Sequence, residues 1–381
     1  MNSNSNSCLT FTAAVLLFHG LILGKTDYLK NFHPDSLRLK KVDAQRCDEA
    51  PIIDGYITDS CWETTRPVDE FFQNEPKELS VPSENTVARV CFDNEALYIF
   101  IEAFDSQPEN IKKTLVRRDR WMDGFANNSD WVGVTIDSKN DDYNGYFFAV
   151  NASGVIMDVA LSGEWDYDPT WNPVWDVDIA FNDSGWTAEF KLPFAVFQFE
   201  NKPGMEWGIE FERSIHRLQE RVGWPGRSKS IRGLILPLGV LSGINNIPTP
   251  KQLEVIPYGL TGYSDKTHGN IGLDIRYGLT SNSMMKLTFN PDFGQVEADP
   301  SVLNLTAFET FYEEKRPFFS EGSEFFSHRI SLFNSRRIGR RPNYNIPDDG
   351  ELEGIPEYTT ILGASRIMGS TSSGINYGFI G

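Results

Sequence analysis

Residues that most often carry metal or nucleophilic chemistry are scarce in this sequence. Among 381 residues there are 4 cysteines and 5 histidines. No two cysteines form a C-x-x-C pair, and the histidines show no metal-ligand spacing, so the sequence gives no support to zinc or redox chemistry. A G-x-S-x-G elbow, a P-loop and an H-E-x-x-H motif are absent as well. The sequence thus lacks the motifs of those hydrolases, nucleotide-binding proteins and zinc peptidases.

Basic residues are few compared with acidic ones. There are 35 Lys and Arg residues against 53 Asp and Glu residues, which gives a formal net charge of -18 at pH 7. A chain this negative repels phosphate backbones, so we expect no nucleic-acid partner. The same charge is compatible with neutral ligands such as sugars, and with divalent cations.

Long apolar runs are limited to one, at residues 8–24. A polar and charged segment follows, and Gly24, with Ile22 two residues before it, offers a tolerable cleavage site. We therefore predict an export signal peptide at 1–24 and a linker at 25–45. The alternative is an uncleaved anchor, because about 17 apolar residues is the lower limit for spanning a bilayer. In both cases we expect the remainder of the chain to be exported to the cell envelope.

Removal of the signal peptide would take Cys8 away and leave an odd number of cysteines. The remaining three are Cys47, Cys61 and Cys91. One disulfide plus a free buried thiol is compatible with this number, and so are three buried thiols.

Long stretches in which apolar residues recur with the 3.6-residue period of a helix are also lacking. From Cys47 to about Arg217, apolar residues instead occupy every second position. Along 207–212, apolar residues alternate with glycine and glutamate, so one face of this strand is predicted to be apolar and the other wet or charged. An aromatic content of 13% suits such strands. We predict two antiparallel sheets packed face to face, a β-sandwich over 46–245. Tryptophans on strand positions, expected to be core or sheet-face residues, are Trp175, Trp186 and Trp207.

A second all-β region begins near Gln252. Its candidate strands alternate apolar with small or polar residues and are rich in Gly and Tyr, which is typical of membrane β-barrel strands. These strands are at 253–263, 270–280, 283–293, 358–369 and 373–381. A closed barrel needs about eight strands. We therefore predict that 250–381 is the start of an incomplete antiparallel membrane β-barrel in a truncated chain. The alternative is a second all-β domain outside a membrane.

Five separated motifs resemble carbohydrate-binding module family 9. The opening segment IIDGYITDSCW (52–62) is similar to the I-D-G-x-x-D-x-x-W pattern of that family. The others follow in the family's order: ARVCFDNEALYIFIEAFD (88–105), SDWVGVTIDS (129–138), GYFFAVNASG (145–154) and GWTAEFKLPF (185–194). A later segment, 290–326, resembles domain of unknown function 5916, an envelope family in which the family-9 module precedes a predicted outer-membrane barrel.

The resemblance implies a carbohydrate-binding β-sandwich exposed at the envelope of a Gram-negative bacterium and attached to an outer-membrane barrel. Its role would be polysaccharide catabolism or uptake, with xylan or glucan as the ligand type. We assign no catalytic residue, because nothing marks one pair among 53 carboxylates as facing a cleft. The alternatives are O-glycosyl hydrolase activity associated with the module and a structural cap of the barrel that binds nothing.

Members of family 9 hold a terminal sugar between two tryptophans from separate loops, and the resemblance places Trp121 and Trp224 at those loops. Two other tryptophans on predicted loops are Trp165 and Trp171. Either clamp ring could instead cover the end of the sandwich. Charged residues near these loops that would bond the sugar hydroxyls, or else form ion pairs on a solvated rim, are Arg118, Asp119, Glu164 and Arg221.

Calcium is the one cofactor that the resemblance suggests, because family-9 modules often bear it. The loop NDDYNG (140–145) is similar to half of a calcium-binding loop, but Asn151 stands where the bidentate Glu would be needed. A tight Asn-Gly hairpin turn explains the same residues. The sequence therefore allows calcium without identifying its ligands.

Overall fold

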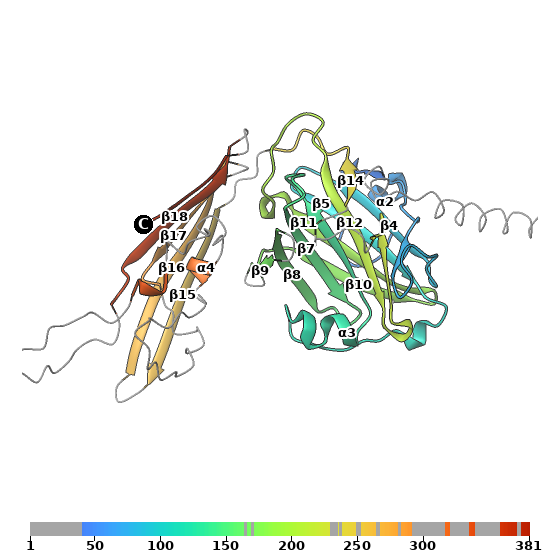
Figure 1. The fold of residues 1–381 in the computed structure, drawn as a ribbon, viewed down its shortest axis with the longest axis horizontal. Coiled ribbons are helices and arrows are strands. Elements are labelled where there is room, and N and C mark those ends of the chain that lie inside the picture. Colours follow the sequence, from blue (N-terminus) through green and yellow to red (C-terminus); the bar gives the residue numbers. More distant parts are fainter. Residues whose placement is uncertain are drawn as a thin grey trace, which may run out of the picture. The chain divides into compact units, whose positions relative to one another are not determined.

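The fold is described from a computed structural model (Figure 1). It describes residues 40–163, 166–168, 171–228, 235, 238–248, 253–263, 267–280, 283–291, 317–320, 335–339, 359–371 and 375–381. The chain divides into two compact units, one of Met1–Val196 with Lys202–Ile247 and the other of Phe197–Asn201 with Pro248–Gly381. The predicted signal peptide lies outside the described residues.

The first unit contains two sheets. Sheet A has nine strands, and sheet B has five. Sheet A runs in the order β1 (Lys41–Asp43), β14 (Gly239–Ser242), β12 (Trp207–Ile215), β6 (Trp131–Asp137), β7 (Asn144–Asn151), β8 (Ile156–Ser162) and β9 (Asp166–Asp168), while β13 (Glu220–Trp224) pairs with β12 and with β3 (Phe72–Glu75). Sheet B runs in the order β10 (Asp176–Asn182), β11 (Gly185–Pro193), β5 (Ala96–Phe104), β4 (Thr86–Phe92) and β2 (Gln45–Arg46).

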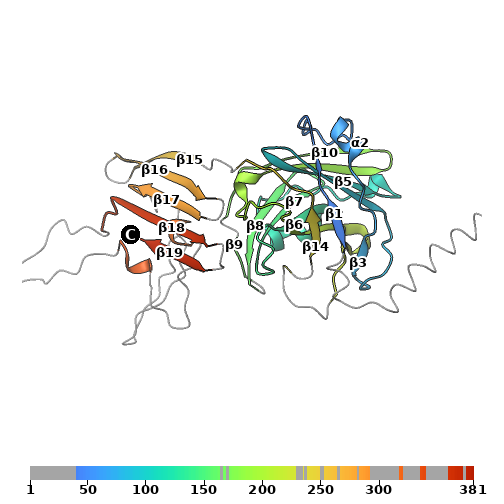
Figure 2. The same ribbon diagram turned by 90° about the horizontal axis from the view of Figure 1, so that it is seen from above.

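The two sheets are stacked as layers, with β5 and β10 of sheet B above β6, β7 and β8 of sheet A in Figure 2. Apart from the parallel pairs β1–β14 and β2–β4, the strand pairs within them are antiparallel. Apolar side chains from alternate positions fill the space between the layers, among them Val134 of β6 and Ile99 of β5, both fully buried. The predicted β-sandwich is confirmed.

Helical segments of the described chain are short. They are α2 (Ser60–Thr64), η2 (Pro108–Asn110), η3 (Trp121–Phe125, a π-helical turn), α3 (Ala126–Asn128), η4 (Phe194–Val196), η5 (His216–Leu218), α4 (Pro317–Ser320) and η7 (Ser335–Arg337). None of the helices in the part of the chain that the structure describes is long and apolar enough to cross a membrane.

Tryptophans that the strand pattern assigned to the core are buried. Trp175, Trp186 and Trp207 all have little exposed surface. The Trp175 ring stacks on Phe190 of sheet B and lies edge-on to Phe148 of sheet A, so it joins the two layers. The sequence prediction for these three residues is confirmed.

Arg213 on β12 is a buried charge between the layers. Its Nη1 donates to the Asn85 carbonyl at 2.8 Å, and its Nη2 donates to the Phe104 carbonyl at 2.8 Å. Burial lowers the pKa of Arg213 to about 10, while Asp130 and Asp105 oppose the shift. A buried guanidinium held by backbone carbonyls fixes the alignment of β12 against the chain at β5, because moving it would leave a charge without partners.

Two sequence expectations about local structure are wrong. Residues 41–43, assigned to a linker, form β1, because Val42 is buried while Lys41 and Asp43 on either side are exposed. Asn144 and Gly145, expected to be a hairpin turn, are the first residues of β7. The turn between β6 and β7 is made instead by the residues before them.

The second unit contains sheet C, in which all neighbouring strands are antiparallel. Its strands, in both sheet and chain order, are β15 (Leu253–Tyr263), β16 (Thr267–Thr280), β17 (Ser283–Phe289), β18 (Gly363–Ser370) and β19 (Asn376–Ile380). These strands lie within or overlap the five predicted segments. The polar face of the sheet carries Lys286 and Arg366, both buried, and the Arg366 Nη1 donates to the Phe318 carbonyl of α4 at 2.6 Å.

Candidate functional site

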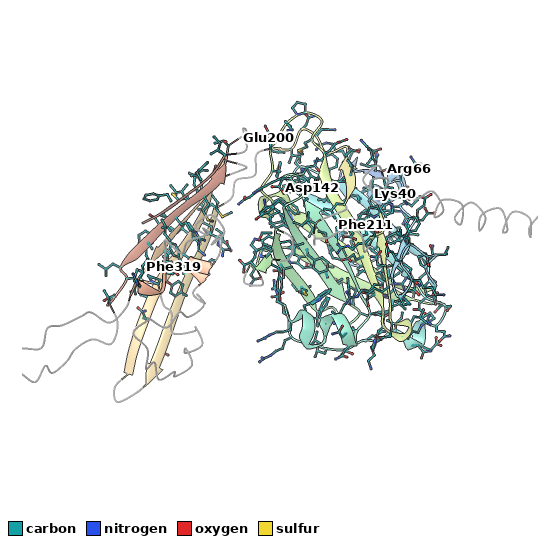
Figure 3. All side chains as sticks on the ribbon, viewed as in Figure 1. Lys40, Arg66, Asp142, Glu200, Phe211 and Phe319 are labelled. Carbon is teal, nitrogen blue, oxygen red and sulfur yellow. The ribbon has the colours of Figure 1, made fainter. Side chains whose placement is uncertain are left out.

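Trp224, one half of the expected tryptophan clamp, is a core residue. It is the last residue of β13 and has 3% of its surface exposed. Its ring centroid lies 5.7 Å from that of Phe211, which Figure 3 labels within the sandwich. A Cβ added at Gly239 would lie 2.7 Å from its indole ring. The expectation that Trp224 lies on an end loop is therefore wrong, because pairing with β12 and β3 makes 220–224 a strand.

Trp121, the other half, lies in a different environment. It belongs to the π-helical turn η3 and is partly buried against Phe125, Trp131 and Phe147, with ring centroids between 5.2 and 6.0 Å from its own. These neighbours form an apolar layer on the outer face of sheet A, the face turned away from sheet B. Trp121 thus packs on that face while part of its surface stays exposed.

Arg221 is brought to Trp121 by the strand pairing. It is paired with Ser214 across β12 and β13, so it lies on the outer face of sheet A together with Glu212, two residues before Ser214. Its guanidinium carbon lies 5.6 Å from the Trp121 ring centroid. Of the expected sugar-binding residues, Trp121 and Arg221 are therefore in contact, as a cation over an aromatic ring.

Glu210 lies on the same outer face and is fully buried. Its Oε2 accepts a hydrogen bond from Arg227 Nη2 at 2.8 Å. Burial raises the pKa of Glu210, and the charge of Arg227 opposes that shift. No donor from the described residues reaches its Oε1. This face of β12 is therefore charged at Glu210, as predicted, but the charge is buried and paired with Arg227 rather than exposed to water.

Asn74 completes the polar part of this face. Its Oδ1 accepts the backbone N–H of Arg227 at 3.0 Å. Its Nδ2 lies above Gly223, where a Cβ would come within 2.7 Å of it and within 3.5 Å of Glu210 Oε1. Gly223 therefore allows an amide and a carboxylate to lie close together over β13. We call Asn74, Trp121, Glu210, Glu212, Arg221 and Arg227 the outer-face cluster.

Arg118 and Asp119 belong to a second group of side chains. Arg118 Nη2 donates to Asp158 Oδ1 at 2.7 Å and also to the Asn172 side chain. Asp119 Oδ1 accepts the backbone N–H of Asp158 at 3.1 Å, and Asp158 Oδ1 also accepts from Trp175 Nε1 at 3.0 Å. Burial raises the pKa of Asp119. We call Arg118, Asp119, Asp158, Asn172 and Trp175 the edge cluster, because it lies along β8 and the chain leading to β10.

Of the remaining sequence candidates, Glu164 and Trp165 lie outside the described residues. Trp171 is partly buried, with its ring centroid 4.8 Å from that of Tyr146. The sequence analysis missed Asn74, Glu210 and Arg227, which have no motif and no shared spacing. The charged alternation along β12 pointed to Glu210 and Glu212 alone, whereas Asn74 on β3 and Arg227 after β13 had no signal in the sequence.

Calcium has no support from the loop between β6 and β7. Asp141 Oδ1 accepts the backbone N–H groups of Tyr143 and Asn144, and Asp137 Oδ2 accepts that of Asp142. These carboxylates thus bond the loop's own main chain. In the part of the chain that the structure describes, the one group of three or more metal-ligating side chains is made of cysteines, not of carboxylates.

Comparisons with known proteins agree with the two-part organisation. A family model described as carbohydrate family 9 binding domain-like matches residues 53–218, and a model of domain of unknown function 5916 matches residues 249–381. No curated protein matches the sequence.

Among solved structures, a family 9 carbohydrate binding module from Caldicellulosiruptor kristjanssonii in complex with cellotriose is similar at 15% identity, with a TM-score of 0.36. The match covers 53% of this chain and 93% of that one. A family 9 module from Caldicellulosiruptor kristjanssonii in complex with glucose is similar at 13% identity, with a TM-score of 0.37. The match covers 54% of this chain and 97% of that one. The family models thus identify residues 53–218 as carbohydrate family 9 binding domain-like and residues 249–381 as a domain of unknown function 5916.

Proposed function

We propose that the sandwich binds carbohydrate at the outer-face cluster of sheet A. The observation that carries this proposal is the partly buried Trp121, whose ring lies under the guanidinium of Arg221 on the same sheet face as the buried carboxylate of Glu210. The match of 53–218 to a carbohydrate-binding family model supports it.

The chemistry of a pyranose fits these groups. Its C–H face packs on an aromatic ring, and its hydroxyls bond planar polar side chains. Arg221 and Arg227 offer N–H donors in a rigid fork and Asn74 offers its Nδ2 as a further donor, while Glu212 offers carboxylate acceptors. Glu210 is fully buried, so it would hold the Arg227 guanidinium in place through its Oε2 rather than contact the sugar. The cluster would hold one end of a saccharide without cleaving it.

The test is a calorimetric titration of the full chain with glucose, cello-oligosaccharides and xylo-oligosaccharides. Trp121→Ala should lower the affinity about tenfold or more, because loss of about 1.4 kcal/mol of binding energy is a factor of ten. Trp171→Ala is the matched control, since it removes a second partly buried indole that lies outside the outer-face cluster. Loss of binding in Trp171→Ala alone would place the site elsewhere, and a panel without any bound sugar would favour a structural cap.

We also propose that sheet C attaches the sandwich to the outer membrane as part of a β-barrel, so that saccharide captured at the envelope serves catabolism or uptake. The strand register puts apolar side chains without any charge on one face of the sheet. That face carries Leu253, Val255, Ile271, Leu273, Ile275, Tyr277, Met285, Leu287, Phe289, Ile367, Tyr377 and Phe379. The opposite face carries the charges, including Asp274 and Arg276. Alternation of this kind is what lipid on one side and a polar interior on the other require.

A charge on the apolar face tests this attachment. Ile271→Lys, at a position with 79% of its surface exposed, should reduce recovery of the full chain in the outer-membrane fraction of a Gram-negative host. Asn270→Lys, on the opposite face of the same strand, is the matched control and should be recovered as the unmodified chain is. Equal recovery of both variants would contradict a lipid-facing sheet.

A further inference from the structure

Three cysteines from separate parts of the chain meet on the outer face of sheet B. Cys47 follows β2, Cys61 is in α2, and Cys91 is on β4. Their Sγ atoms all lie within 4.8 Å of one another, and all three are free thiols. Cys91 is fully buried, and Cys47 and Cys61 have 8% and 7% of their surface exposed. The convergence of three sulfurs is a property of the fold, because no two of them are close in sequence.

The sulfur spacing is close to what one bound ion requires. A metal ion about 2.3 Å from each of three sulfurs separates them by about 4 Å. The sulfurs here would need to move by less than about 1 Å to reach that spacing. The neighbouring side chains Trp62, Ala96 and Phe100 form an apolar wall. Two of the cysteines retain a little exposed surface, through which an ion could enter.

A fourth ligand is not arranged around these sulfurs. No histidine or carboxylate of the described residues joins the three-sulfur group. The nearby Asp93 is engaged otherwise, since its oxygens accept the backbone N–H groups of Glu95 and Ala96 and the hydroxyl of Tyr98. Structural zinc sites are almost always four-coordinate and tetrahedral, so this set is incomplete for zinc. Soft thiolate ligands suit Cu(I), which accepts three sulfurs in one plane.

We propose that Cys47, Cys61 and Cys91 form a three-sulfur site for a soft, low-coordinate metal ion, with Cu(I) as its occupant. Binding forms three metal–sulfur bonds without any change of oxidation state, and the protons of the bound thiols leave to solvent. The site lies on sheet B, so it is independent of saccharide binding on sheet A.

The acidity of the three thiols in the metal-free protein is compatible with the proposed three-sulfur site. Hydrogen bonds with Cys61 and Cys91 lower the pKa of Cys47, while hydrogen bonds with Cys47 and Cys61, together with burial, raise the pKa of Cys91. Of the three thiols, Cys47 is therefore the one that loses its proton most readily, and metal binding displaces the protons that the three cysteines still carry. Because metal ligands must lose their protons, the affinity for Cu(I) should rise with pH.

The experiment uses the full chain with Cys8→Ser, which removes the fourth thiol and leaves the cluster unchanged. Reduced protein is titrated anaerobically with Cu(I) in competition with a chromophoric Cu(I) chelator. We expect one Cu(I) per chain, an ultraviolet thiolate-to-copper band, three thiols protected from a thiol reagent, and tighter binding at higher pH. A parallel titration with Zn(II) should show weaker binding.

Single variants locate the ion. Cys47→Ser and Cys61→Ser should each weaken binding by more than the roughly 10–100-fold that loss of an outer partner of a metal ligand costs. Cys8→Ser alone is the matched control and should bind as the unmodified chain does. Should a variant fail to fold, the copper stoichiometry of the unmodified chain still decides the matter. Absence of a one-to-one complex, binding unaffected by Cys47→Ser, preference for zinc, or a disulfide between two of the three cysteines in the purified protein would each overturn the proposal.

Discussion

The guanidinium carbon of Arg221 lies 5.6 Å from the ring centroid of Trp121, although 100 residues separate them in sequence. The contact exists because β13 pairs with β12, which puts Arg221 on the outer face of sheet A, where η3 packs. The same guanidinium lies 5.8 Å from the ring centroid of Trp131. A planar cation over two indoles is thus the centre of the outer-face cluster.

Arg221→Lys should weaken saccharide binding more than it weakens the fold. Lysine keeps the charge but loses the planar fork that stacks on a ring and bonds hydroxyls in pairs. We expect about tenfold lower affinity by calorimetry, and a change in the free energy of unfolding below about 1 kcal/mol by urea denaturation. Unchanged affinity in this variant would show that Arg221 only packs against the rings.

Trp224→Ala should destabilise the sandwich by about 3–5 kcal/mol, because it empties a buried space next to Phe211. Gly239→Ala should also destabilise it, since the new Cβ would lie 2.7 Å from the Trp224 ring. In a Trp224→Phe background the smaller ring leaves room, so the cost of Gly239→Ala should fall by about 1 kcal/mol. Strictly additive effects in this cycle, measured by urea denaturation, would argue against the contact.

Asp158→Ala tests whether the edge cluster is structural. It leaves the buried Trp175 Nε1 without its acceptor, which should cost about 1–3 kcal/mol in the free energy of unfolding. Arg118→Ala is the control and should cost less, because the Arg118 side chain is 41% exposed and Asp158 keeps its bond to Trp175. Saccharide affinity should be similar in both variants. A lost affinity with unchanged stability would instead assign sugar binding to the edge cluster.

Glu189 should make the sandwich less stable as pH rises from about 4.5 to 7. Burial raises the pKa of Glu189 to about 7 from its ordinary 4.5, against the opposing N–H donors of Asp54, Trp62 and Gly55. The folded state thus holds a proton that the unfolded state releases, so its stabilising contribution is complete below pH 4.5 and lost as pH rises through 7. The loss is at most about 3 kcal/mol.

Glu189→Gln should flatten that part of the stability curve, because the amide does not titrate. Thermal unfolding of both proteins between pH 4.5 and 8 measures the difference. The variant also loses one acceptor, so the useful quantity is the slope with pH rather than the absolute melting temperature. Equal slopes in the two proteins would show that Glu189 is ionised throughout this range.

Strand alternation in the sequence predicted the sandwich because burial on one side of a sheet imposes a period of two. It failed for β13, whose five residues include charge and glycine and owe their extended form to neighbours on both sides. It placed Glu210 on the charged face of β12 but did not predict its burial, since alternation distinguishes the two faces of a strand and cannot tell whether the outer one is covered.

The sequence by itself determined the all-β class, the order of the strands along the chain, the burial of Trp175, Trp186 and Trp207, and the apolar and polar faces of sheet C. These follow from local periodicity and from the free energy of removing apolar side chains from water. Only the tertiary structure decided that Arg221 meets Trp121, that Trp224 is a core residue, and that three distant cysteines share one site. Each depends on which strands pair and what covers their outer faces, and non-local pairing of this kind leaves no spacing in the chain.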